Sequence, residues 1–150
     1  MVMVEFAIVL PVLMLVLLGI IDFGRIMNYT DQEQQMAAQA ARWGAVDWDP
    51  GSQSIQQYVQ AQALGGLGTT SGDVKSGAQV FLYYPTGSSN TVGSPIRACV
   101  VADVQLLPML GSATLKLVQA ATMRVETLGT SSSFTADSTT TAGGAGCPTS

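Results

Sequence analysis

The longest pattern in the chain is an apolar run near its start. Residues 6–21, FAIVLPVLMLVLLGII, carry no polar side chain, and residues 1–4 extend the run with Glu5 as the one interruption. At about 1.5 Å per residue, a helix over residues 1–21 is roughly 30 Å long, which matches the hydrocarbon core of a bilayer. No Lys or Arg precedes Arg25, so the run lacks the basic region of a cleaved secretory signal. The pattern predicts a membrane-length helix.

The helical pattern continues beyond the apolar run, but its composition changes. Residues 30–45 are rich in Gln and Ala, and the small residues Ala37, Ala41 and Gly44 would let another element approach closely. Asp49-Pro50-Gly51 ends the pattern, because the residue before a proline avoids helical backbone angles. The sequence therefore predicts one helix of about 45 residues whose second half packs on a sheet.

Three later segments alternate between apolar and polar positions and predict strands. They lie near residues 78–84, over 96–106 and from Leu115 to Val125. Strict alternation is typical of an antiparallel sheet with one buried and one solvent-exposed face. Before them, Ser54-Ile55-Gln56-Gln57 fits the capping box of a short helix. The predicted fold is α+β, with a long N-terminal helix packed by its second half on a small antiparallel sheet of about three strands, plus a short helix.

Composition excludes several classes of function. The chain has 150 residues, of which 11% are charged, its net charge is −4, and it has no histidine. The absence of a basic patch argues against nucleic acid as a partner. Without histidine, the serines have no common activating base, so we expect no enzyme, no catalytic residue and no cofactor. Asp47-x-Asp49-x-Gly51 is similar to the start of a calcium loop, but Tyr58 stands where the bidentate Glu belongs, so no metal site is predicted.

Glu5 is the anomalous residue of the apolar run. A carboxylate near the end of a membrane-length helix costs about 2–3 kcal/mol, so it should be solvated or paired. One interpretation places Glu5 among the lipid headgroups. The other pairs Glu5 with the α-ammonium of residue 1 of a neighbouring copy, because parallel packed helices would bury both charges. Pro11 leaves two interpretations as well, a simple kink or a stretch that unwinds locally during assembly, and Gly19 is a second weak point of the helix.

The N-terminal segment resembles a known family. Residues 4–11, VEFAIVLP, and residues 19–25, GIIDFGR, resemble the opening and the close of the apolar segment of TadE-like pilins, a branch of the type IV pilin-like proteins. Residues 40–45, AARWGA, and 121–126, ATMRVE, resemble two further segments of that family. On this resemblance, residue 1 is expected to be the processed N-terminus that remains after a prepilin peptidase removes a basic leader.

The resemblance implies a structural pilin subunit that polymerises through its hydrophobic helix into an extracellular type IV or Tad-like pilus, with a role in adhesion. The implied partners are identical subunits, the inner membrane before assembly, the prepilin peptidase, and an assembly ATPase with its platform. Two alternatives remain: a minor or priming pilin-like component, or a single-pass membrane-anchored binding protein. Met1 and Glu5 are expected to set the register between subunits. The residues expected to pack in the filament core are Phe6, Leu10, Pro11, Leu13, Leu17, Gly19 and Phe23.

The two cysteines and the chain organisation complete the prediction. Cys99 falls on the solvent-exposed face of the middle strand, and Cys147 lies near the C-terminus. They are either two unrelated thiols or, in the oxidising compartment that an exported chain meets, one disulfide. Such a bridge closes a loop of about 50 residues, worth about 4 kcal/mol in the chain-entropy model, and would lay the C-terminal segment across the open face of the sheet. The expected regions are the apolar helix (1–25), the α+β head (26–128) and a disulfide-tethered Ser/Thr/Gly-rich tail (129–150).

Overall fold

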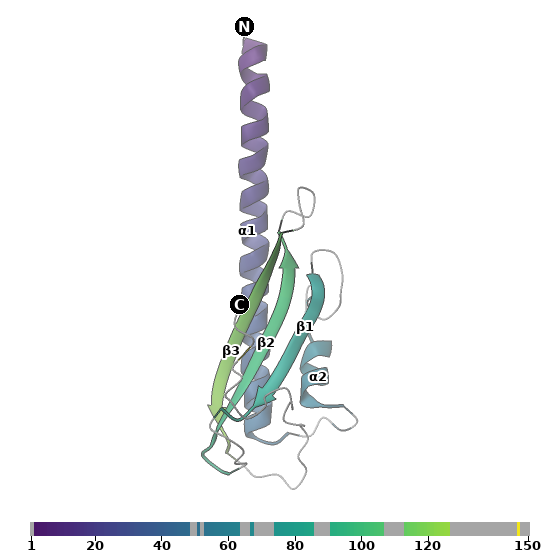
Figure 1. Ribbon diagram of the computed structural model, residues 1–150, viewed down its shortest axis with the longest axis vertical. Helices are drawn as coiled ribbons and strands as arrows, with labels where there is room; N and C mark the ends of the chain where they lie inside the picture. Colours follow the sequence, from purple (N-terminus) through teal and green to yellow (C-terminus); the bar gives the residue numbers. More distant parts are fainter. Residues whose placement is uncertain are drawn as a thin grey trace.

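The described part of the chain folds into two helices and a three-stranded antiparallel sheet (Figure 1). The computed structural model describes residues 2–48, 51, 53–63, 67, 74–85, 91–106, 113–126 and 147. The elements are α1 (Val2–Ala45), α2 (Ile55–Ala61), β1 (Val74–Tyr83), β2 (Pro95–Gln105) and β3 (Thr114–Arg124). The strands lie in the order β1-β2-β3, and both pairings are antiparallel. The predicted α+β fold is confirmed.

Helix α1 is one helix of 44 residues. Its second half lies against one face of the sheet, whereas its first half extends beyond the sheet (Figure 1). Pro11 lies inside the helix without ending it, although it removes the N–H that would otherwise bond to the carbonyl of Ala7. The isolated chain therefore shows no unwound stretch at Pro11, and unwinding during assembly stays a prediction.

Small residues bring α1 close to the sheet. Ala37, Ala40 and Ala41 have no exposed surface. A Cβ atom added at Gly44 would lie 2.7 Å from Cδ1 of the buried Ile96, so glycine permits the closest approach of the helix to the sheet. The larger apolar side chains of the core come from the inward-facing positions of the strands, such as Leu82, Val100 and Val104, so the core lies between α1 and the sheet.

The two strand pairings differ in regularity. β2 and β3 pair in one continuous register over all 11 residues of each strand. The pairing of β1 with β2 contains register shifts between Val74 and Ser76 and between Ser76 and Gln79. These shifts interrupt the alternation, which explains why the sequence pattern starts only at Ala78 whereas the strand starts at Val74.

Helix α2 packs beside β1 and the end of α1, at one edge of the sheet. It begins with the predicted capping box: Ser54 Oγ accepts the N–H of Gln57 at 3.2 Å, and Gln57 Oε1 accepts the N–H of Ser54 at 3.3 Å. Gln60 Nε2 donates to the carbonyl of Ala78 in β1 at 2.7 Å. Ile55 and Val59 are fully buried in the core. The short helix is thus fixed to the edge of the sheet that β1 forms.

Three aromatic rings fasten the end of α1 to α2. The ring centroids of Trp43, Trp48 and Tyr58 lie 4.9–5.2 Å apart, in tilted and edge-to-face arrangements. Aromatic pairs at these distances stabilise a fold beyond the area that they bury. The cluster fixes the point at which the chain leaves the long helix.

The outer face of the sheet is partly covered, which corrects one prediction. Cys99 points to the outer face as expected, but it is fully buried rather than solvent-exposed. The predicted disulfide is present: Cys99 is bonded to Cys147, with their Cα atoms 5.6 Å apart. Cys147 packs with Tyr83 and Val101 in a small second core. The alternation pattern missed this cover because it comes from a residue 48 positions away. The rest of the predicted tail, apart from Cys147, lies outside the described residues.

Gly44→Val tests the close helix–sheet contact. We expect it to lower the stability of the folded head by about 1–3 kcal/mol, because a branched side chain cannot fit between α1 and the buried Ile96 without a shift. The matched control is Gly24→Val, since an added Cβ there meets no atom within 4 Å. Thermal unfolding of both full-length variants in detergent micelles, followed by circular dichroism, gives the comparison. Equal melting temperatures would contradict the prediction.

Cys99→Ser tests whether the bridge holds the C-terminal segment. We expect faster proteolytic cleavage within residues 129–150, because the covalent link to β2 is lost. Limited proteolysis with mass spectrometry measures it. Cys147→Ser is the control and should give the same cleavage rate, since either change removes the same bond. Wild-type cleavage rates in both variants would count against a tethering role.

Candidate functional site

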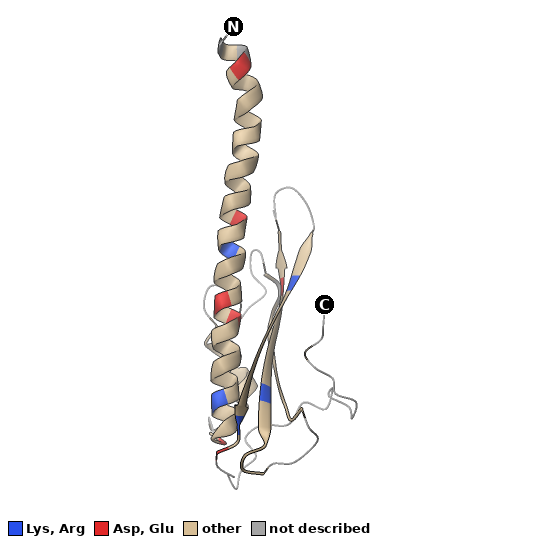
Figure 2. Cartoon of the chain, turned by 90° about the vertical axis from the view of Figure 1, so that its left-hand side faces the viewer, with Lys and Arg blue, Asp and Glu red and all other residues tan. Residues whose placement is uncertain are grey.

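The first half of α1 is an apolar surface that no other described part of the chain covers. Most of its large side chains are exposed, from 38% at Leu10 to 89% at Met3. The helix is long and apolar enough to cross a membrane by length and composition, and none of its most apolar window is buried. Figure 2 shows that charged residues are sparse along this projecting half. An apolar surface of this length in a folded protein marks a site of contact with lipid or with other chains.

The residues predicted to pack in a filament core surround this helix. Phe6, Leu10, Leu13 and Leu17 are spaced so that they share one face. Pro11, Gly19 and Phe23 point away from that face, as their spacing on a helix requires. All of these positions are exposed, and they do not converge in the single chain. Because they occupy different sides, one partner helix cannot bury them all, whereas a bundle of several helices or lipid can.

Glu5 is exposed in the first turn of α1. A carboxylate at this end of a helix interacts favourably with the helix dipole. Within the described part of the chain, Glu5 has no ionic partner. Met1 lies outside the described residues, so the pairing of Glu5 with the α-ammonium of a neighbouring copy stays a prediction.

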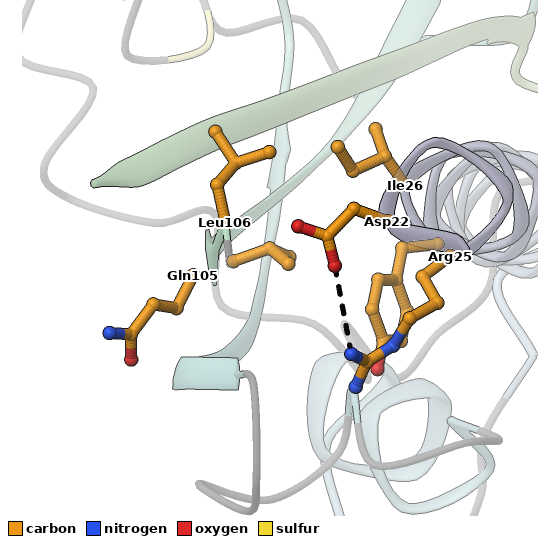
Figure 3. Close-up of a pocket in the computed structure, with 7 residues that line it drawn as sticks. Asp22, Arg25, Ile26, Gln105 and Leu106 are labelled. Atoms are coloured by element: carbon orange, nitrogen blue, oxygen red, sulfur yellow. Dashed lines mark ion pairs between the residues drawn. The ribbon is translucent and has the colours of Figure 1, made fainter. Parts of the chain in front are cut away.

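The projecting helix enters the head at a small joint (Figure 3). Asp22 and Arg25 form an ion pair of 3.8 Å on one side of α1, and Leu106, just after β2, faces them. The side chain of Asp22 is only 14% exposed. One turn further on, Thr30 Oγ1 donates to the carbonyl of Ile26 at 2.9 Å. The cavity between these residues has about 10 Å³, which is hardly enough for one water, so the joint is a packing contact rather than a ligand pocket.

Glu33 is a buried carboxylate that the sequence analysis missed. It has no exposed surface, and neither carboxylate oxygen has a hydrogen-bond partner. Burial raises the pKa of Glu33 to about 8, because desolvation disfavours the charged form. Its spacing from Ala37, Ala40 and Gly44 places it on the face of α1 that meets the sheet, and this spacing was the available signal. Glu33 lies in the head, outside the membrane-length segment.

No arrangement for metal or cofactor chemistry is found where the structure describes the chain. Within those segments, no three His, Cys, Asp or Glu side chains are grouped so that they could hold a metal ion. Asp49, one of the two carboxylates of the calcium-like segment, lies outside the described residues.

The comparisons with known proteins bear on the helix alone. Residues 1–45 match the family model described as TadE-like protein, which confirms the resemblance of residues 4–11, 19–25 and 40–45, whereas residues 121–126 lie outside the match. The matched segment coincides with α1 and includes both its projecting half and the half that covers the sheet. No curated protein and no solved structure matches the chain significantly.

Glu33→Gln tests the buried carboxyl group through the pH dependence of stability. In the wild type, stability falls as pH rises from about 4.5 to about 8, because the unfolded chain ionises Glu33 while the folded chain keeps it neutral. The variant should lack this loss. The unfolding free energy of the variant minus that of the wild type should therefore increase by about a few kcal/mol between pH 4.5 and pH 8. Denaturant unfolding at several pH values measures it. Asp31→Asn, a change at an exposed carboxylate on the same helix, is the control and should keep the wild-type slope.

Proposed function

From the TadE-like match over residues 1–45, which indicates a Tad pilus-related component, we propose that the chain is a structural subunit that polymerises through its apolar helix into an extracellular filament. The observation that carries the proposal is the uncovered first half of α1, whose apolar side chains point to all sides of the helix. Such a helix is stable only in surroundings that are apolar on every side. Lipid provides them before assembly, and a bundle of identical helices provides them in the filament.

The energetics of the helix support a two-stage use of this surface. Removing residues 6–21 from water buries on the order of 1,500 Å² of apolar surface, which is tens of kcal/mol at about 25 cal/mol per Å². Most of this free energy is already gained when the helix enters the membrane. Transfer from lipid to a helix bundle therefore has a small driving force and needs outside work. We propose an assembly ATPase with its platform as the source of that work, and a prepilin peptidase as the enzyme that prepares the N-terminus.

The head occupies the surface of the proposed filament. The outer face of its sheet, which carries the Cys99–Cys147 bond, lies opposite the face that packs on α1, and we propose that this side makes the adhesive contacts. A structural role of this kind requires no catalysis, in keeping with the absence of histidine from the chain. A minor or priming component is the second candidate, since the family match covers the helix that any such component shares and does not extend into most of the head.

Glu5→Ala tests the proposal in cells that assemble the filament. Because an unpaired α-ammonium inside a helix bundle costs roughly 3–5 kcal/mol, we expect the assembled fraction to fall about a hundredfold or more. The amount of chain in the membrane fraction should stay the same, because an apolar helix without Glu5 inserts at least as well. Immunoblots of sheared surface material and of membranes, with electron microscopy of the sheared fibres, measure both quantities.

Asp31→Ala is the matched control, since it removes an exposed carboxylate from the head half of the same helix. It should leave fibres and membrane levels unchanged. The proportion of this chain in purified fibres separates the two candidates: a dominant share supports the main subunit, and a few copies per fibre support the minor component. Two results together would overturn both candidates: intact fibres in cells that lack the chain, and no trace of the chain in fibres purified from wild-type cells. The chain would then be a membrane-anchored binding protein.

A further inference from the structure

The two edge strands of the sheet differ in how far their outer backbone groups are already hydrogen-bonded, and the proposed filament does not depend on this difference. At the β1 edge, the N–H of Ala78 donates to the carbonyl of Leu67 at 2.6 Å, and the carbonyl of Ala78 accepts from Gln60 Nε2 at 2.7 Å. That edge also carries the two register shifts. The β1 edge is therefore a poor site for a further strand, because Leu67 and Gln60 occupy its hydrogen-bonding groups at Ala78 and the strand is irregular.

The edge formed by β3 is regular and open. The strand has 11 residues, it contains no proline, and its pairing with β2 has no bulge. In the described part of the chain, no backbone hydrogen bond joins residues 114–124 to any segment other than β2. Ala120 and Thr122, in the middle and toward the end of the strand, are exposed. A long regular edge of this kind presents unpaired N–H and carbonyl groups and can accept one more strand.

Positive charge flanks this edge at both ends. The chain has six Lys and Arg residues, and three of them lie here: Lys116 and Arg124 on β3, and Arg42 at the end of α1. Arg42 and Arg124 line a hollow of about 390 Å³ together with Met123 and Glu126. Lys116 stands opposite Asp103 of β2. Even with Glu126 and Asp103 counted, the edge is more basic than a chain whose net charge is −4.

Within the proposed filament, a second copy of the chain cannot add a strand to this edge. This exclusion of a second copy rests on the proposed function. Subunits whose helices all point the same way meet through heterologous contacts, in which two different surfaces touch. The β3 edge of one copy would then need the β1 edge of the next, which is closed by Leu67 and Gln60. The basic side chains of β3 also disfavour pairing with another basic edge.

We propose that the β3 edge is a docking site for an extended, acidic segment of a partner protein, which adds a fourth strand to the sheet. Backbone hydrogen bonds to residues 114–124 supply the attachment, and acidic side chains of the segment are selected by Lys116 and by the Arg42–Arg124 hollow. Such a site would let the head hold a partner outside the helix bundle, so that the bundle itself is undisturbed.

The test uses the full chain in detergent micelles and a fluorescent synthetic peptide of alternating Thr and Glu, about 10 residues long to match a strand. We expect saturable binding by fluorescence anisotropy, and slower amide hydrogen exchange within residues 114–124 when the peptide is bound. A Thr/Lys peptide of the same length should bind at least about tenfold more weakly. A Thr/Glu peptide with N-methylated alternate amides, which keeps the charges but cannot form the ladder, should lose binding.

Charge reversal on the protein provides the matched variants. Arg124→Glu should weaken binding of the acidic peptide about tenfold, equivalent to about 1.4 kcal/mol, whereas Arg25→Glu, the same change on α1 away from the edge, should not. Circular dichroism checks that the sheet persists in both. If the N-methylated peptide binds as tightly as the unmodified one, charge attraction alone explains the binding and the proposal is overturned. Slower amide exchange on β1 instead of β3, or no binding of the Thr/Glu peptide, would overturn it as well. If the chain forms dimers in which amide exchange on β3 is slowed, the edge binds a second copy of the chain and the present proposal is wrong. This result would be independent of whether the chain forms a filament.

Discussion

Where the structure describes the chain, the first half of α1 has no hydrophobic partner, and the arrangement of the head depends on this. A membrane-length apolar helix cannot remain in water, because exposing it costs tens of kcal/mol at about 25 cal/mol per Å². The chain meets this constraint by separation: the head builds its core without using residues 2–21, and these residues stay available for lipid or for other helices. A single helix thus belongs to two environments, and its two halves have different compositions for that reason.

The join between these environments is built from small residues and from a few polar contacts. Ala37, Ala40, Ala41 and Gly44 let the second half of α1 lie close to the strands, so a narrow helix and a small sheet suffice for a core. Where α1 leaves the head, the Asp22–Arg25 pair marks the end of the apolar segment. A continuous helix through this joint transmits the position of the apolar half directly to the head, so the packing of helices would fix the placement of heads on a filament surface.

The head carries features that its own stability does not require. Glu33 is buried without a hydrogen-bond partner, which lowers stability at neutral pH relative to acid pH. The β3 edge is open and basic, although natural proteins usually close or shorten such edges. The disulfide, by contrast, adds stability by joining a distant residue to the middle strand. Features that cost stability or invite association are where function is to be sought in a small domain.

The elements and their order follow from local patterns in the sequence. Periodicity fixed the long helix, the strands and the capped short helix, because these depend on neighbouring residues whose side chains share a face. The similarity of residues 1–45 to TadE-like proteins could also be predicted, since it rests on contiguous motifs. Tertiary structure alone decided the burial of Cys99, the desolvation of Glu33 and the difference between the two sheet edges. The cover over Cys99 and the closure of the β1 edge come from residues far apart in the chain, which no local pattern reveals. The helical spacing of Glu33 indicates the face on which it lies, but the extent of its burial depends on the strands that pack against that face.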